Sequence, residues 1–165
     1  MTLGDGSTRI NGKVIFFKIG LWHETLIDVD KPVNIFTSIN SYMGRMKHWN
    51  VYALETIYEK LFQHSKPIDV LKIDVEGAEV LALEKSLNSG FLQKNVKQIT
   101  LEWHLWRVSM WNNREALRKL LEIYLKLFEF GFKLFYHGNN GDRAAQLGVF
   151  PLTSFINTNL YNQLE

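Results

Sequence analysis

The stretch DVLKIDVEGAEVLALEKSL, residues 69–87, decides the fold of this chain. It opens with a short, mostly apolar run over 69–74, which is typical of a buried strand. Residues 77–87 then carry apolar side chains at helical spacing, and Gly90 follows as a stop signal. The stretch therefore predicts a strand, a short turn and a helix, which is the repeating unit of an α/β sheet.

Similar patterns continue this alternation on both sides of that unit. They predict strands over 13–20, 96–104, 132–137 and 147–157, and helices over 48–64 and from Asn112 to a stop at Gly131. The last two strands are separated by a turn-rich segment, and Pro151 predicts a bend or bulge in the final one. We therefore expect an α/β sheet that is mostly parallel, with an antiparallel strand at its carboxyl end.

Composition narrows the class of protein. The 165 residues suit one domain, and 46% hydrophobic residues are enough for a packed core. Net charge is +2 and no run of five like charges occurs, so nucleic-acid binding is not indicated. Without cysteine there are no disulfides and no thiolate sites. Neither a signal peptide nor a transmembrane segment is visible in this chain, so we expect it to be soluble, in a compartment that stays unknown.

The first candidate site lies where the strand over 69–74 ends. Asp74 and Glu76 project to the same side if the chain stays extended there. Two such carboxylates can hold Mg²⁺ or Ca²⁺, or one can act as a general base on a substrate hydroxyl. Alternatively, Glu76 and Glu79 only complement the positive end of the following helix.

Two further candidates follow other strands. Glu102 and His104 share one strand face, where they can form a metal-ligand pair, a base with its orienting partner, or only a structural hydrogen bond. Gly20, Leu21 and Trp22 follow the first strand and can receive a flat ring, although Trp22 can equally fill a core.

Residues 69–81 closely resemble the "LKIDVEGAE…VL" stretch of FkbM-like S-adenosylmethionine-dependent methyltransferases. Trp49 followed by residues 53–57 is similar to the helix that these proteins place before that strand, and 99–104 are similar to their "LE(I/W)H" strand. The strong resemblance covers about residues 68–104, and a weaker one extends over 14–157.

This resemblance implies a Rossmann-like sheet with strand order 3-2-1-4-5-7-6 and S-adenosylmethionine bound above its carboxyl edge. It implies methyl transfer, with a hydroxyl of a small molecule or glycan as acceptor. The five predicted strands match the third to the seventh, so the first two, with the glycine-rich cofactor loop, would precede Val14. Thirteen residues are too few for them. We therefore expect residues 1–165 to form one methyltransferase-like domain that is incomplete at its amino-terminal end.

Omitting two strands has a geometric consequence. In the implied order, the strands over 14–19 and 70–74 would lie about three spacings of 4.8 Å apart, or roughly 14 Å. An open gap would expose two apolar edges, so we expect the sheet to be either gapped or re-paired.

The resemblance also implies roles for the candidate residues. Asp74 would lie at the active-site end of its strand, with Glu76, Glu102 and His104 around the acceptor or a divalent metal. Residues 20–22 would face the adenine of S-adenosylmethionine. The alternative is a noncatalytic interaction module that has lost cofactor binding.

Overall fold

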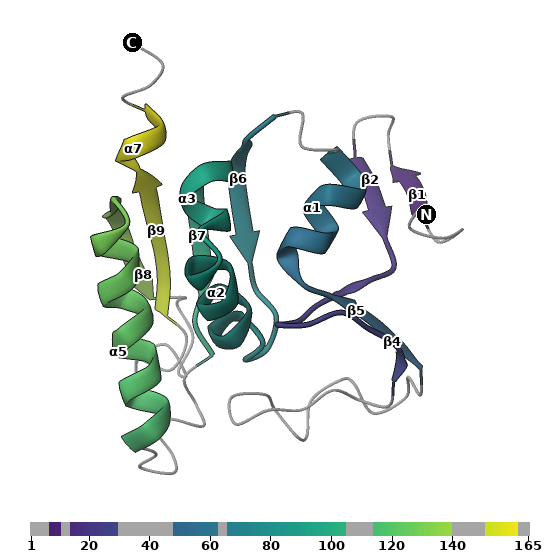
Figure 1. The fold of residues 1–165 in the computed structure, drawn as a ribbon, viewed down its shortest axis with the longest axis horizontal. Coiled ribbons are helices and arrows are strands. Elements are labelled where there is room, and N and C mark those ends of the chain that lie inside the picture. Colours follow the sequence, from purple (N-terminus) through teal and green to yellow (C-terminus); the bar gives the residue numbers. More distant parts are fainter. Residues whose placement is uncertain are drawn as a thin grey trace.

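The computed structural model describes residues 7–10, 14–29, 48–62, 66–104, 114–139 and 151–161. Its elements are β1 (Ser7–Ile10), β2 (Val14–Phe17), β3 (Gly20–Leu21), β4 (Leu26–Val29), β5 (Trp49–Tyr52), α1 (Leu54–Phe62), β6 (Ile68–Ile73), α2 (Glu79–Asn88), α3 (Phe91–Asn95), β7 (Val96–Glu102), α5 (Arg114–Glu129), β8 (Phe132–Asn139), β9 (Pro151–Asn157) and α7 (Thr158–Tyr161). The strands form three sheets, ordered β1-β2, β3-β5-β4 and β6-β7-β9-β8, in a mixed α/β fold (Figure 1).

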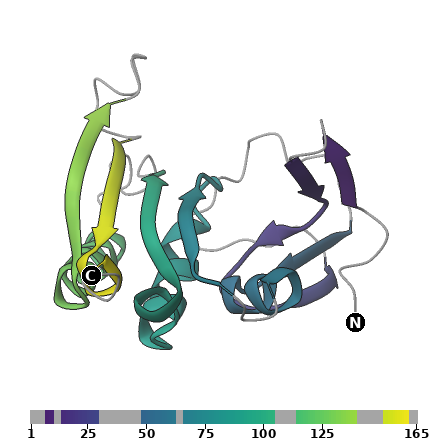
Figure 2. The same cartoon turned by 90° about the horizontal axis from the view of Figure 1, so that it is seen from above.

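The four-stranded sheet carries the main core. β6 and β7 run parallel, and β9 lies antiparallel between β7 and β8. This order, β6-β7-β9-β8, is the one that the resemblance implied for the fourth, fifth, seventh and sixth strands. Helices α2 and α5 cover the same face of the sheet (Figure 2). Ile99, Leu101 and Trp103 are buried there, as the alternation in the sequence predicted.

The expectation of a mostly parallel sheet is wrong for the described residues. Only the pairs β3–β5 and β6–β7 are parallel, whereas the pairs β1–β2, β4–β5, β7–β9 and β8–β9 are antiparallel. The pairs β1–β2, β4–β5 and β8–β9 each join consecutive strands, which can pair antiparallel without the crossover that a parallel pair needs.

The segment predicted as one strand over 13–20 is instead two strands. β2 pairs antiparallel with β1, which the sequence did not indicate, and β3 pairs parallel with β5. The first predicted strand therefore pairs elsewhere, as the re-paired alternative expected, whereas β6 pairs only with β7 among the described residues and keeps its other edge unpaired, as in the gapped one.

The segment predicted as a helix over 48–64 begins as a strand. β5 comes first, and α1 starts only at Leu54. Val51 is buried because β5 lies between β3 and β4, a long-range pairing that helical spacing cannot reveal. The Ala53 N–H donates to Oγ1 of Thr25 at 3.3 Å, which helps to fix the junction between strand and helix.

The remaining predicted elements are confirmed, with shifted ends. α2 begins at Glu79 rather than Gly77. β8 and β9 correspond to the last two predicted strands, and residues 147–150 of the last one lie outside the described residues. Pro151 is the first residue of β9, and the bulge of this strand pair lies in β8 instead. The predicted cap at Asn112 lies outside the described residues. Of the turn predicted over 138–142, Gly138 and Asn139 instead end β8, and 140–142 lie outside the described residues.

Candidate functional site

The site forms where two parallel strands end at the same edge of the sheet. In the register of β6 and β7, Ile73 lies beside Leu101. Asp74 and Glu102 are the next residue of each chain segment, so the pairing places them side by side. In open α/β sheets this carboxyl edge is where ligands bind.

A strained turn follows Asp74. The Ala78 N–H donates to the carbonyl oxygen of Val75 at 3.1 Å, which closes a turn over residues 75–78. Its two central residues, Glu76 and Gly77, have φ angles of 53° and 97°. Positive φ at both positions is the signature of a type I′ turn, and it costs about 1–2 kcal/mol at a residue with a side chain such as Glu76. The turn holds the Glu76 carboxylate over the edge of the sheet.

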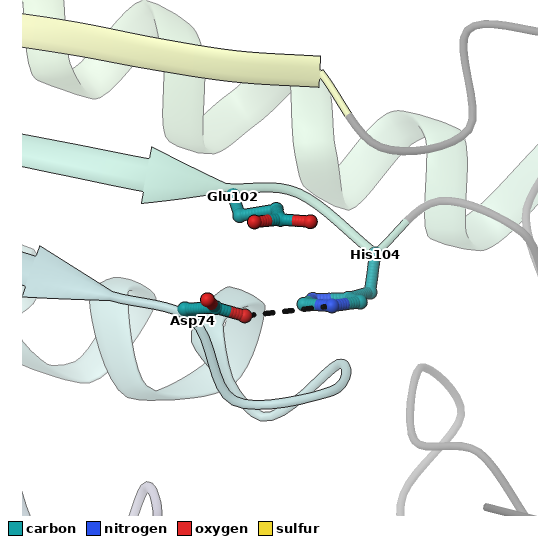
Figure 3. Close-up of side chains that lie close together, drawn as sticks. All are labelled: Asp74, Glu102 and His104. Carbon is teal, nitrogen blue, oxygen red and sulfur yellow. Dashed lines mark ion pairs between the residues drawn. The ribbon is translucent and has the colours of Figure 1, made fainter. Parts of the chain in front are cut away.

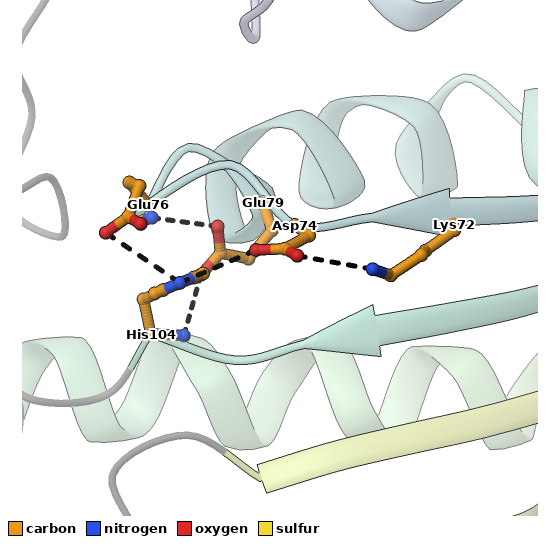
Figure 4. Close-up of polar contacts among 6 residues, drawn as sticks. Lys72, Asp74, Glu76, Glu79 and His104 are labelled. Atoms are coloured by element: carbon orange, nitrogen blue, oxygen red, sulfur yellow. Dashed lines mark hydrogen bonds and ion pairs between the residues drawn. The ribbon is translucent and has the colours of Figure 1, made fainter. Parts of the chain in front are cut away.

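Glu79, the first residue of α2, is fully buried and binds both ends of the site (Figure 4). Its Oε2 accepts the Gly77 N–H at 2.8 Å, and its Oε1 accepts the backbone N–H of His104 at 2.8 Å. Nδ1 of the His104 ring lies 3.1 Å from the same Oε1. A carboxylate only accepts hydrogen bonds, so this contact places a proton on Nδ1. Glu79 therefore fixes the orientation and the tautomer of the imidazole.

The other ring nitrogen of His104 is surrounded by negative charge. Nε2 lies 3.8 Å from Oδ1 of Asp74 and 3.8 Å from Oε2 of Glu76. Burial by itself lowers the pKa of His104, but the hydrogen bond and charge of Glu79, followed by the charges of Glu76 and Asp74, outweigh it. The pKa of His104 is therefore raised above the ordinary 6.5.

Asp74, Glu102 and His104 form a compact group of potential metal ligands (Figure 3). Each offers one ligand atom, and these atoms lie within 4.8 Å of one another. The other oxygen of Asp74, Oδ2, lies 3.3 Å from Nζ of Lys72. With Glu76, the edge thus combines three carboxylates, an imidazole and one nearby ammonium group.

All four residues predicted as catalytic meet at this edge. Asp74, Glu76 and His104 are joined by ion-pair distances, and Glu102 completes the group of ligand atoms. Glu79 was interpreted from the sequence only as a complement to the helix dipole. Its spacing two residues after Gly77 gave no sign of burial, because its two contacts with His104 come from a residue 25 positions further along the chain.

Of the predicted cofactor residues, Trp22 lies in a second and smaller core, and Leu21 packs against the main core. Trp22 is only 5% exposed and packs with Val51 and Ala78, so its side chain fills a core. Gly20 instead lines a cavity of about 270 Å³ together with Phe16, Lys18, Ile19, His48, Trp49 and Asn50. The role of residues 20–22 toward a cofactor stays a prediction.

Trp103 anchors the strand segment between Glu102 and His104. Its side chain is fully buried, and its indole N–H donates to Oγ1 of Thr153 at 2.7 Å. The ring stacks on Tyr124 of α5 with centroids 5.0 Å apart. These contacts fix the backbone on both sides of Trp103, so the flanking site residues share a rigid support.

Comparison with known proteins assigns the family. The model of the methyltransferase FkbM domain matches residues 47–134, just over half of the chain. The chain therefore belongs to the FkbM methyltransferase family, which makes it methyltransferase-like, and the whole cluster around His104 lies within the matched residues. No curated protein and no solved structure matches the chain. Within the described residues, no helix is long and apolar enough to cross a membrane.

Proposed function

We propose that this chain is an S-adenosylmethionine-dependent methyltransferase domain that transfers a methyl group to a hydroxyl of a small molecule or glycan. The observation that carries the proposal is the cluster of Asp74, Glu102 and His104 at the carboxyl edge of β6 and β7, within the residues that match the family. In this proposal the four-stranded sheet is the carboxyl-terminal half of a Rossmann-like fold.

The chemistry of the donor set fits a positively charged cofactor. S-adenosylmethionine, when bound, supplies a methyl group on a sulfonium centre. Asp74, Glu76 and Glu102 are carboxylates that remain partly exposed at the edge of the sheet, so they can attract such a cation. We assign the adenine to the neighbouring residues 20–22, on the resemblance described above.

His104 is the proposed general base. With its Nδ1 proton directed to Glu79, the neutral ring presents the lone pair of Nε2 toward the edge where Asp74 and Glu76 lie. Nε2 would take the proton of the acceptor hydroxyl, and the oxygen would form a bond to the methyl carbon as the carbon–sulfur bond breaks and the sulfur leaves as a neutral thioether. The carboxylates would stabilise the resulting imidazolium, and a pKa raised above 6.5 suits proton transfer near neutral pH.

Calorimetric titration with S-adenosylmethionine tests the proposal. We expect saturable binding by the wild-type chain and weaker binding by Asp74→Asn. The matched control is Asp69→Asn, because Asp69 lies on the same strand but pairs with Lys97 away from the site. No binding to the wild-type chain, or equal losses in both variants, would contradict the assignment.

A divalent cation is a second candidate ligand for the same cluster. It is favoured by the 4.8 Å spacing of the ligand atoms and by the bond between Glu79 and Nδ1, since metal-ligating histidines usually donate their other N–H to a carboxylate. Mixed carboxylate and imidazole ligands suit Mn²⁺ better than Mg²⁺.

Titration with Mn²⁺, followed by the loss of its free electron paramagnetic resonance signal, tests the cation separately. We expect Glu102→Gln to remove the binding and Glu84→Gln to leave it unchanged, because Glu84 pairs with Lys119 between α2 and α5. If Mn²⁺ does not bind but S-adenosylmethionine does, the cation proposal is wrong and the methyltransferase proposal stands.

The noncatalytic interaction module remains the alternative function. The burial of Trp22 against Val51 and Ala78 favours it, because a packed ring cannot stack on an adenine without moving. The same calorimetric titration separates the two functions: saturable binding of S-adenosylmethionine would exclude a module that has lost the cofactor.

A further inference from the structure

Helix α5 carries a stripe of exposed apolar side chains. Leu117, Leu121, Leu125 and Phe128 are 48–59% exposed. At 3.6 residues per turn, these four side chains project within about 80° of one another. A surface helix of a monomer normally directs its polar residues outward, so such a stripe marks an interaction site. We call these four residues the α5 stripe.

The core of the molecule does not use the α5 stripe. The opposite face of the helix carries Ile123 and Leu127, which are buried in the main core. In Figure 1, α5 is the outermost helix on its side of the molecule, beside α2. Only Phe128 reaches inward, with its ring 6.2 Å from that of Phe155. The helix thus has one apolar face for the core and a second one for a partner.

The apolar surface continues from the helix onto the sheet. Leu134 of β8 lies directly opposite Phe155 in the strand register, so both side chains project to the face that α5 covers. Leu134 is itself exposed, and Phe155 is the residue that Phe128 contacts. Leu134 therefore extends the stripe at its carboxyl-terminal end.

The charges beside the stripe change sign along the helix. Lys119 and Lys126 turn away to α2, where they bind Glu84 at 2.6 Å and Asn88 at 2.7 Å. The other exposed charges of the helix are Arg114, Glu115 and Arg118 in its first half and Glu122 and Glu129 in its second half, so the first half is net positive and the second net negative. Such a face is complementary to a copy of itself turned end to end, and repels a parallel copy.

We propose that the α5 stripe is the interface of a homodimer in which two α5 helices pack antiparallel across a two-fold axis. Matching the ends of the stripe places Leu117 opposite the partner's Phe128 and Leu121 opposite the partner's Leu125. Arg118 then lies opposite the partner's Glu129. The dimer is independent of the methyltransferase function, because the stripe shares no residue with the site around His104.

Cross-linking between single cysteines tests the orientation, and the chain has no cysteine of its own. We expect a short dimaleimide to join chains only when Leu117→Cys and Phe128→Cys proteins are mixed. In the Leu117→Cys protein alone, the two thiols of an antiparallel dimer would lie about 16 Å apart along the axis. Cross-links within the Leu117→Cys protein alone would indicate a parallel pair and overturn the proposal.

Sedimentation equilibrium tests the dimer itself. We expect Leu121→Lys, at an exposed position, to raise the dimer dissociation constant at least about thirtyfold with unchanged circular dichroism. Arg118→Glu should also weaken the dimer, and adding Glu129→Arg should restore it, because the two reversed charges face each other again. A protein that stays monomeric at all concentrations would overturn the proposal, and so would a dimer unaffected by these substitutions. Either result would do so even if another protein were found to bind the stripe.

Discussion

Replacing Glu79 by glutamine tests whether this buried carboxylate holds the site together. The substitution keeps the size of the side chain but leaves one acceptor oxygen in place of two. In the wild-type protein the Gly77 N–H donates to Oε2 of Glu79 at 2.8 Å. If the remaining oxygen of the glutamine keeps both contacts to His104, the new amide NH₂ takes the place of Oε2 and faces this N–H. Two donors then meet in a position without access to water.

The expected loss of stability follows from these bonds. Losing a hydrogen bond to a charged group costs about 1.5–3 kcal/mol, and the two that remain lose their charge assistance. We therefore expect Glu79→Gln to lower the free energy of unfolding by about 3 kcal/mol. For a chain of this size this corresponds to a melting temperature lower by about 6–12 °C.

Urea unfolding followed by circular dichroism measures the effect, with Glu84→Gln as the matched control on the same helix. Glu84 is partly exposed and pairs with Lys119, so its replacement should cost about 1 kcal/mol or less. If Glu79→Gln costs no more than Glu84→Gln, the three hydrogen bonds do not organise the site and the reasoning fails.

Three further predictions concern catalysis, pH and the end of α5. In methyl-transfer assays with an identified acceptor, Asp74→Ala and Glu102→Ala should abolish activity while barely changing the melting temperature, and unfolding of either variant would make its role structural. Because the folded state raises the pKa of His104 above 6.5, its stabilising contribution is complete below pH 6.5 and is lost as the pH rises through the raised value. The free energy of unfolding, measured with a chelator present, should therefore fall over this range relative to His104→Gln. Gly131→Ala should destabilise more than Gly90→Ala in thermal unfolding: both have positive φ, but the added methyl at Gly131 would meet a side chain at 2.5 Å and that at Gly90 nothing nearer than 4.0 Å.

The sequence predicted the positions of the candidate residues at strand ends better than it predicted the sheets around them. Asp74 ends a short, mostly apolar run, and Glu102 lies near the end of the alternating run over 96–104; both patterns are local, so the places of these residues near strand ends could be recognised. By contrast, the strand nature of Trp49–Tyr52 depends on pairing with Gly20 and Leu21, about thirty residues away. Helical spacing in that segment was consistent with α1 and hid the strand before it. Burial of Glu79 depends likewise on a partner 25 residues further along the chain.

The turn over residues 75–78 belongs to two cores at once. Val75 packs against both the main core and the smaller one around Trp22, and Ala78 is buried in the latter. The same turn carries Glu76, whose carboxylate faces the His104 ring. A ligand that displaces Trp22 would therefore shift the carboxylate that stabilises a positive charge at His104. By thermodynamic reciprocity, protonation or cation binding at His104 must change the affinity for that ligand by the same factor.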